Sequence, residues 1–395
     1  MTSLPLNYPL RTPMSQTLRL LMWLTWIFAG VLGTLGMYQR ITQGHLPAGY
    51  GSYVPWGLWV AIYFHGIGIA GGVFVLGAGA FLLDLPGFRR PATLRTVIVL
   101  TVAAIVPAFM AVWLDLGHME RASFIFLSPN FTSMMAFNAW MYNAFIIIAA
   151  AAWALSFRKS GWLKPLLCLA ITFSILFPSQ SGAFFGVVEA KGFWHSALLP
   201  MLFLASAVTA GAAALLLVRT LIGPDRETAD DHAAALARLR LVILEGLIVY
   251  FVFEFAEFSI ALWNPNIHAP AIELILWGPY WWVFWIVHLL LGGAIPLALL
   301  TSRHPVAWAG AALLVATTFI SARLNVLVPG QAIGELDGLQ EAFRHDRLTY
   351  IYHATAMEYL VGFFLLAIGM AVFFIGQKLG AEAERRMQRV SRGET

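Results

Sequence analysis

Residues 55–83 read PWGLWVAIYFHGIGIAGGVFVLGAGAFLL, an apolar run of 29 residues without Asp, Glu, Lys or Arg. An α-helix needs about 20 consecutive apolar residues to cross the hydrocarbon core of a bilayer. The stretch is therefore long enough to form a membrane-spanning helix. Its glycines, among them Gly68 and Gly72, are small residues of the kind that let two such helices approach closely.

The rest of the chain repeats this pattern. Of its 395 residues, 60% are hydrophobic and 11% are charged, whereas soluble domains carry about 25% charged residues. We therefore predict an all-α integral membrane protein, with residues 1–395 forming a single polytopic membrane domain of about ten transmembrane helices. The predicted helices cover residues 17–38, 55–83, 94–115, 134–157, 163–180, 196–221, 240–263, 273–301, 305–323 and 350–377.

The Lys and Arg residues predict the orientation of these helices. One side of the membrane receives 18 of the 24 Lys and Arg residues, and the opposite side receives 6. Because cytoplasmic loops carry the excess of Lys and Arg, we expect a multi-pass protein of the inner (cytoplasmic) membrane with both termini in the cytoplasm. Residues 378–395 are expected to form a cytoplasmic basic tail. The net charge of only +4 predicts membrane lipid, and not nucleic acid, as the partner of these charges.

The single cysteine limits the metal chemistry of the chain. Cys168 lies inside an apolar run, and one thiolate cannot hold an iron–sulfur cluster or a structural zinc ion. We therefore expect no metal site in this chain, and any iron–sulfur centre must lie on another polypeptide.

Ionisable residues inside predicted spans are candidates for function, because each costs at least about 2.5–3.5 kcal/mol on insertion scales. His65 lies about 15 Å into the second span at the helical rise, and a neutral imidazole can both donate to and accept from a quinone ring. Asp115 closes the third span, and His118 shares its face if the helix continues. Such a pair could take up a proton. The alternatives are a histidine packed between helices and an interfacial turn with a capping carboxylate.

Glu254 and Glu257 are three residues apart in the seventh predicted span. Two carboxylates this close should not both ionise in a low dielectric, which suits proton transfer. Pairing with Arg323, placed at the end of the ninth predicted span, is a structural alternative that is compatible with such a role. Glu245 lies deeper toward the cytoplasm on the same helix, and it could extend a proton route or form an interfacial salt bridge.

Other polar residues lie within or beside the later spans. For Glu358, in the tenth span, we weigh proton transfer against interhelical hydrogen bonding. The fifth span ends in residues 177–182 (FPSQSG), a polar and breakable segment at membrane depth, where irregular backbone is tolerated only against protein or a cavity. His288, in the middle of the eighth span, has no acidic residue nearby, and we interpret it as a packing residue. His353 has no role that we can assign.

Several blocks resemble the NrfD/polysulfide-reductase membrane subunit family, especially the ten-span branch that includes the hydrogenase-2 membrane subunit. They are spread in order over nearly the whole membrane region. The blocks are 54–59 (VPWGLW) with its glycine-rich continuation, 115–118 (DLGH), 128–133 (SPNFTS), Glu254 with Glu257, 323–325 (RLN) and 350–358 (YIYHATAME). The chain departs from the family pattern at 350–353, where that pattern more often reads Tyr-x-Pro-Ser.

The resemblance implies two four-helix bundles, formed by spans two to five and six to nine, with flanking helices at the ends. It implies a haem-free subunit of a respiratory oxidoreductase that binds menaquinone or ubiquinone near the outer face. Electrons would pass between the quinone pool and a periplasmic-side, ferredoxin-like iron–sulfur subunit. A catalytic subunit would be a further partner, of the molybdopterin enzyme, hydrogenase or multihaem cytochrome kind. The outer loops are the longer ones, which would suit such docking.

The resemblance also implies roles for individual residues. His65, Asp115 and His118 would be the catalytic residues of the quinone site, and we expect Trp59 and Tyr142 to line the same site. The residues expected to transfer protons are Glu245, Glu254, Glu257, Arg323 and Glu358. The sequence permits proton translocation but does not establish it.

Two other functions fit the same residues. A b-type cytochrome anchor would use His65 and His288 as haem ligands, since they lie about 15 and 20 Å into spans that run in the same direction. A proton-coupled transporter without a redox role would use Asp115, Glu254 and Glu257 as relay carboxylates. Copurification of an iron–sulfur protein would favour the quinone-linked subunit.

Overall fold

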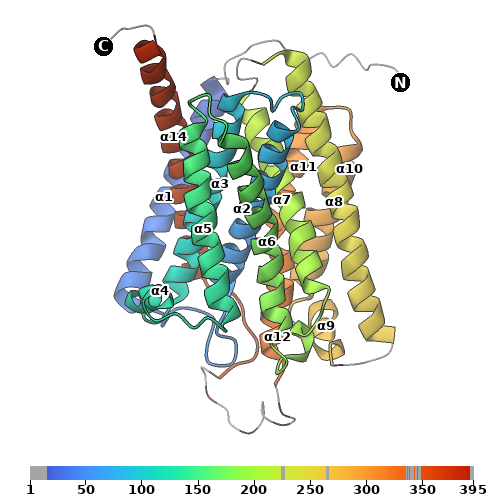
Figure 1. Cartoon of the computed structure of the whole chain (residues 1–395). Helices are drawn as coiled ribbons and strands as arrows, with labels where there is room; N and C mark the ends of the chain where they lie inside the picture. The colour runs from blue at the N-terminus through green and yellow to red at the C-terminus, as the bar shows by residue number, and fades with distance from the viewer. Residues whose placement is uncertain are drawn as a thin grey trace.

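The computed structural model describes residues 16–223, 227–263, 267–334, 336, 338, 342, 345 and 348–391. Within these residues every regular element is a helix, and the long helices run side by side (Figure 1). The elements are α1 (Gln16–Gln43), α2 (Leu58–Leu82), α3 (Pro91–Asp115), η1 (Met119–Ser123), α4 (Phe124–Leu127), α5 (Met134–Leu155), α6 (Leu163–Gly186), η2 (Gly192–Trp194), α7 (Leu199–Ile222), α8 (Ala229–Trp263), α9 (Ala269–Leu276), η3 (Val283–Ala294), α10 (Ile295–Thr301), α11 (Pro305–Thr318), α12 (Ile320–Ala332) and α14 (Ala356–Ser391).

Nine stretches of the described residues are helical and apolar over a length that can cross a membrane. They are α1, α2, α3, α5, α6, α7, η3 with α10, α11 with α12, and α14. The predicted span 240–263 lies within α8, a 35-residue helix that carries three glutamates and packs beside α7. The prediction of an all-α membrane protein with about ten spans is confirmed.

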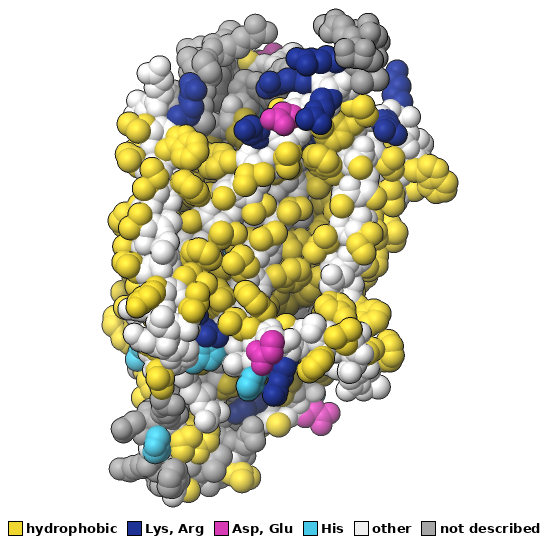
Figure 2. All heavy atoms as spheres, turned by 90° about the vertical axis from the view of Figure 1, so that its left-hand side faces the viewer, with side chains coloured by type: hydrophobic (Ala, Val, Ile, Leu, Met, Phe, Trp, Pro, Cys, Tyr) yellow, Lys and Arg dark blue, Asp and Glu magenta, His cyan; other side chains and the backbone are white. Residues whose placement is uncertain are grey.

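Polar and apolar side chains are separated along the helix axes. Figure 2 shows a broad hydrophobic band between two polar ends, with Lys and Arg gathered at the end where α14 finishes. We call this the basic end and the other the opposite end. Five residues of the predicted charge count lie outside the described residues, namely Arg11, Arg226, Arg344, Arg347 and Arg392.

The helices form two four-helix bundles. Helices α2, α3, α5 and α6 pack together, and α7, α8, α11 and the rod of η3 with α10 form the second set. Helices α1 and α14 pair with each other as flanking helices, and α14 packs against α3 (Figure 1). This is the arrangement that the family resemblance implies.

Helix α2 joins the two bundles, because it packs on α3 and α6 on one side and on α7 on the other. A Cβ atom added at Gly72 would lie 2.0 Å from the carbonyl oxygen of Ala207, and one added at Gly211 would lie 2.4 Å from the carbonyl carbon of Gly72. Neither position has space for a side chain. Small residues at this crossing therefore allow the two backbones to touch.

The breakable segment at residues 177–182 stays helical, because α6 is one helix from Leu163 to Gly186 with Pro178 inside it. Membrane helices tolerate proline where neighbouring groups surround the freed backbone carbonyl. Gly71 of α2 provides this close packing. A Cβ there would lie 2.7 Å from Cγ of Pro178 and 2.8 Å from the carbonyl oxygen of Ser174, the carbonyl that Pro178 cannot bond.

The predicted span 273–301 is two elements in the structure. The short helix α9 ends at Leu276, the chain turns at Trp277 and Gly278, and the spanning rod begins at Val283. The first 12 residues of this rod, η3, form a π-helix, in which each backbone hydrogen bond reaches five residues along the chain. Such helices are rare, usually short, and frequent at functional sites.

The last two predicted spans are displaced at the opposite end. Helix α12 continues to Ala332, so Arg323 lies inside the spanning rod and not at its end. Helix α14 begins at Ala356, and residues 350–355 form an irregular segment before it.

Replacing Gly72 with valine should force α2 and α7 apart and destabilise the protein by about 1–3 kcal/mol or more, as overpacking does. The thermal unfolding midpoint of the purified protein in detergent measures this effect. Gly79→Val is the matched control on the same helix, because nothing lies within 4 Å of a Cβ atom at Gly79. Equal midpoints for the two variants would contradict the close crossing of α2 and α7.

Candidate functional site

Glu358, near the start of α14, is a buried carboxylate that holds two loops together. Its Oε1 accepts a hydrogen bond from the hydroxyl of Tyr352 at 2.5 Å, and its Oε2 accepts from the backbone N–H groups of Gly49 at 2.9 Å and Thr355 at 3.0 Å. The bond from Thr355 is one half of a helix capping box. Burial and the Glu358 carboxylate raise the pKa of Tyr352, so this hydroxyl remains a donor. These hydrogen bonds hold the loop at Gly49 and the segment at Tyr352 against the start of α14.

Arg40, in the last turn of α1, caps the end of α3. Its Nε donates to the carbonyl of Leu114 at 2.9 Å, and its Nη2 donates to the carbonyl of Leu116 at 3.2 Å. Nε2 of His45 lies 3.2 Å from the same Leu114 carbonyl. The last carbonyls of a helix lack partners inside it, so these side chains complete α3. They also place a guanidinium close enough to Asp115 to interact with it electrostatically.

Asp115 and Tyr50 each have a buried polar atom near the end of α3 that has no hydrogen-bond partner among the described residues. These atoms are Oδ1 of Asp115 and the hydroxyl of Tyr50. The ring of Tyr50 lies edge-on to the rings of His45 and Trp59, with centroids 5.3 and 6.0 Å away. Burial, followed by the carboxylates of Asp115 and Glu358, raises the pKa of Tyr50. Because an unsatisfied buried polar group costs about 1–3 kcal/mol, these two atoms beside an aromatic wall are suited to a polar ligand.

We call this group the Asp115 cluster, and it lies where α1 and α3 end and α2 and α14 begin. Its members are Arg40, His45, Tyr50, Trp59, Asp115, Tyr352 and Glu358.

The predicted pairing of Asp115 with His118 is not formed. Helix α3 ends at Asp115, and Leu116 turns into extended backbone with φ −65° and ψ 133°, so helical spacing no longer applies. The His118 side chain is exposed, and its Nδ1 lies 2.9 Å from Oε1 of Glu120.

His65 lies on a different face of α2 from Trp59. Its Nε2 donates to the carbonyl of Ala316 in α11 at 2.7 Å, whereas the indole of Trp59 donates to the carbonyl of Glu358 at 3.1 Å. The structure therefore directs His65 toward the second bundle and does not bring it to Asp115.

Arg323 is buried within the second bundle beside α2. Its Nη2 donates to the hydroxyl of Ser206 at 2.7 Å and to the carbonyl of Phe203 at 3.2 Å, and its guanidinium lies 3.9 Å from the centre of the Phe203 ring. A Cβ atom at Gly68 would lie 3.2 Å from the same Nη2. In the part of the chain that the structure describes, no carboxylate lies within 4 Å of this guanidinium, so the predicted pairing with Glu254 or Glu257 is not formed.

Glu254 instead belongs to a chain of hydrogen bonds across the second bundle. It accepts from the hydroxyl of Tyr250 at 3.0 Å and lies 3.1 Å from Nε2 of His288. Nδ1 of His288 lies 3.1 Å from the hydroxyl of Ser321, which donates to the carbonyl of Thr318 at 2.5 Å. The imidazole thus has an oxygen at each nitrogen, an arrangement that can hold a proton between His288 and Glu254. We call Tyr250, Glu254, His288 and Ser321 the His288 chain.

The expectation that His288 has no acidic residue nearby is wrong. His288 is fully buried, and its acid lies 34 residues earlier on another helix. The signal available in the sequence was its position in the middle of an apolar span, which marks an ionisable residue as a functional candidate.

Glu257 and Glu245 are separate from the His288 chain. Oε1 of Glu257 lies 2.9 Å from Nδ1 of His268, and its Oε2 accepts from the hydroxyl of Ser196 at 3.1 Å. Glu245 is on the exposed side of α8, together with Ile248 and other exposed apolar side chains. The three glutamates of α8 therefore have three different surroundings.

Tyr142 lies in the core of the first bundle. Its hydroxyl accepts from the hydroxyl of Tyr63 at 3.2 Å and lies 2.9 Å from Oγ of Ser181. Ser181 in turn donates to the carbonyl of Phe177 at 2.8 Å. Tyr63 also packs against the hydrophobic cluster that contains Trp59 and Leu114, so this hydroxyl series starts near the Asp115 cluster.

The geometry of the two span histidines bears on the cytochrome alternative. Both ring nitrogens of His288 have hydrogen-bond partners, and Nε2 of His65 faces a backbone carbonyl. The two rings are thus directed to other groups and not to a shared ligand. Among the described residues, no group of three or more His, Cys, Asp or Glu side chains is arranged to hold a metal ion.

Comparison with known proteins places the chain in a family. The family profile described as Polysulphide reductase, NrfD matches residues 48–334. A selenate reductase subunit from Mesobacillus selenatarsenatis is 26% identical over 89% of this chain and 92% of its own. The Hdr-like menaquinol oxidoreductase integral membrane subunit of Archaeoglobus fulgidus is 25% identical over 90% of this chain and 92% of its own.

A third relative, Protein NrfD of Escherichia coli, is 22% identical over 62% of this chain and 83% of its own. The matched residues of the family profile include α2 to α12, and therefore both four-helix bundles. Since this match covers well over half of the chain, the protein belongs to the NrfD (polysulphide reductase) family.

Proposed function

We propose that the chain is the quinone-exchanging membrane subunit of a respiratory oxidoreductase, and that the Asp115 cluster is its quinone site. The observation that carries this proposal is the pair of buried, unpartnered atoms, Oδ1 of Asp115 and the hydroxyl of Tyr50, beside the ring of Trp59. The names of two relatives support it, since one is a menaquinol oxidoreductase subunit and the other a reductase subunit.

The residues of the cluster match the needs of quinone chemistry. A bound menaquinone or ubiquinone supplies the transfer of two electrons together with two protons. The Tyr50 hydroxyl, whose raised pKa keeps it protonated, is a donor for a carbonyl oxygen. Asp115 is a base that can hold a proton beside Arg40, and Trp59 offers a flat apolar wall. Burial lowers the pKa of His45, so this imidazole is neutral at pH 7.

Two of the predicted site residues, His118 and His65, are not part of the proposed quinone site. His118 is exposed and paired with Glu120, and His65 faces α11. The site therefore rests on Asp115, Tyr50 and Trp59, with Tyr142 reached through Tyr63.

Electrons would reach the cluster from a partner protein at the opposite end. The connections at that end carry the short helices η1, α4 and α9 (Figure 1), a structured surface for docking. We propose a ferredoxin-like iron–sulfur subunit there, joined to a catalytic subunit. On the positive-inside rule, we propose that the chain lies in the inner membrane with the basic end and both termini in the cytoplasm.

A second proposal is that the His288 chain moves protons during turnover. The buried Glu254 carboxylate and the imidazole of His288, which the π-helix η3 carries, lie 3.1 Å apart and form a titratable pair in the middle of a bundle. The buried guanidinium of Arg323 lies in the same bundle. A transporter without a redox role would also need such a titratable pair. We favour proton translocation coupled to quinone chemistry because the same chain also carries the proposed quinone site at the Asp115 cluster.

Asp115→Asn and Tyr50→Phe should each reduce quinol-dependent turnover of the intact complex about tenfold or more, because general acid–base groups contribute at least that much. The measurement is reduction of the complex by quinol, normalised to the amount of assembled subunit. Glu120→Gln and Tyr38→Phe are the matched controls on exposed residues. Normal rates in both cluster variants would contradict this placement of the site.

Glu254→Gln and His288→Gln should lower the number of protons moved per electron pair more than they lower electron transfer. The test uses the complex in sealed vesicles with a pH-sensitive dye inside, and records acidification and quinol oxidation together. Glu245→Gln is the control, since Glu245 is an exposed acid on the same helix. If Glu245→Gln alters the ratio as much as Glu254→Gln, or if the ratio stays normal throughout, the His288 chain is not a proton route.

A further inference from the structure

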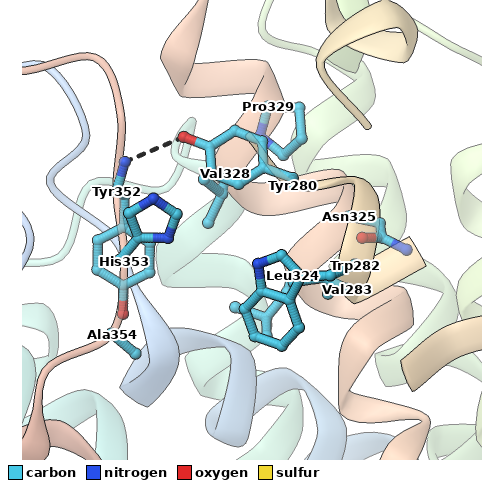
Figure 3. Close-up of a pocket in the computed structure, with 10 residues that line it drawn as sticks. All are labelled: Tyr280, Trp282, Val283, Leu324, Asn325, Val328, Pro329, Tyr352, His353 and Ala354. Carbon is cyan, nitrogen blue, oxygen red and sulfur yellow. Dashed lines mark hydrogen bonds between the residues drawn. The ribbon is translucent and has the colours of Figure 1, made fainter. Parts of the chain in front are cut away.

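A pocket lies at the opposite end, between the start of η3, α12 and the segment before α14 (Figure 3). Its volume is about 80 Å³, whereas one water needs about 10–15 Å³ on a comparable measure. The walls include the rings of Tyr280, Trp282, Tyr352 and His353. The cavity is therefore large enough to admit part of a ring and is lined largely by aromatic surfaces.

Asn325 of α12 brings a buried amide to the wall of this cavity. The residue is 4% exposed and lines the cavity, and its Nδ2 has no hydrogen-bond partner among the described residues. A buried amide without a partner is uncommon in folded proteins. In Figure 3 the amide oxygen faces the other lining residues, and turning the amide over about its Cβ–Cγ bond would present Nδ2 to a carbonyl oxygen within the cavity.

The walls of the cavity are fixed by hydrogen bonds. The Tyr280 hydroxyl accepts from the backbone N–H of Tyr352 at 3.0 Å, a bond drawn in Figure 3, and donates to the carbonyl of Tyr350 at 3.3 Å. On the other side the Tyr352 hydroxyl donates to Glu358. The His353 ring lies 6.2 Å from the Tyr280 ring between centroids. The cavity is thus a preformed site with an exposed histidine at its edge.

The surroundings of the cavity indicate the kind of molecule that would enter it. Trp282 lines it and is 38% exposed, and the nearby Trp281 and Trp285 are exposed as well. Exposed tryptophans at the end of membrane helices lie at the level of the lipid headgroups. Neither Lys nor Arg lines the cavity, so it does not suit the phosphate of a lipid headgroup. A planar, uncharged ring with carbonyl oxygens, reaching the site from the bilayer, fits these walls.

We propose that this cavity, with Asn325 as donor and His353 at its rim, is a second quinone ring site, distinct from the Asp115 cluster. This inference rests on the proposed function, since it assumes that the subunit works with quinones. Tyr352 separates the two sites, because its ring lines the cavity and its hydroxyl bonds Glu358 of the cluster. A ring bound in the cavity would therefore contact Tyr352, the residue that donates to Glu358.

The test counts bound rings in the intact complex embedded in lipid nanodiscs. The probe is menadione, a naphthoquinone ring without an isoprenoid tail, measured by equilibrium dialysis against protein-free nanodiscs. Wild type should bind two molecules per chain. Asn325→Leu should lose one of them or weaken it about tenfold, the effect of losing one good hydrogen bond. Asn143→Leu is the matched control, because Asn143 is an exposed asparagine in the other bundle.

A second variant tests the cavity even if Asn325→Leu fails to fold. If Asn325→Leu does not assemble, His353→Phe at the exposed rim should keep the fold and still weaken one of the two bound molecules. Asp115→Asn should remove the other molecule and leave the Asn325-dependent one.

The outcomes separate the two proposals. A single bound ring that persists in both Asn325→Leu and His353→Phe but is lost in Asp115→Asn overturns the second site and leaves the proposed function intact. A single ring lost in Asn325→Leu and kept in Asp115→Asn supports the cavity and overturns the placement of the quinone site at Asp115. Absence of any specific binding overturns both.

Discussion

The contact of α2 with α7 is the constraint on which the other features depend. Where the backbones touch at Gly72 and Gly211, α2 becomes the shared wall of both bundles. One face of α2 then carries Trp59 toward α14, and another carries His65 toward α11. The two polar regions, the Asp115 cluster and the His288 chain, are therefore built on either side of one rigid helix. A looser crossing would leave space for lipid or water between them.

The buried polar groups at the opposite end differ in how completely they are bonded, and this difference separates the proposed ligand-binding groups from the scaffold groups there. Each oxygen of the Glu358 carboxylate has a donor, and its bonds tie loops to a helix start. Oδ1 of Asp115 and Nδ2 of Asn325 are equally secluded but have no partner among the described residues. In a membrane, where no bulk water can compensate, an incompletely bonded group is costly. We therefore assign ligand binding to these two groups and a scaffold role to Glu358.

Much of the fold could be predicted from the sequence, because apolar runs of the length of 55–83 have one stable arrangement in lipid. The site was harder to predict. Spacing along one helix predicts which residues share a face, but it does not identify their neighbours on other helices. His288 bonds Glu254, which lies 34 residues earlier in the chain. Tyr50 lies in a loop that has no periodic sequence pattern. Asp115 and His118 do not share a helix face because α3 ends at Asp115. The π-helix η3 leaves no mark in the hydropathy of 273–301, so its register could not be foreseen.

That π-helix has a consequence for how the second bundle tolerates change. In η3 every turn contains more residues than a turn of α-helix. The direction in which His288 points therefore depends on how the twelve residues of η3 are wound on both sides of it. A substitution several residues away that rewinds the segment into α-helix would rotate the imidazole off Glu254 without touching either residue. The hydrogen bond between His288 and Glu254 thus depends on the winding of the backbone as well as on the two side chains. Substitutions at other positions in η3 can therefore abolish it.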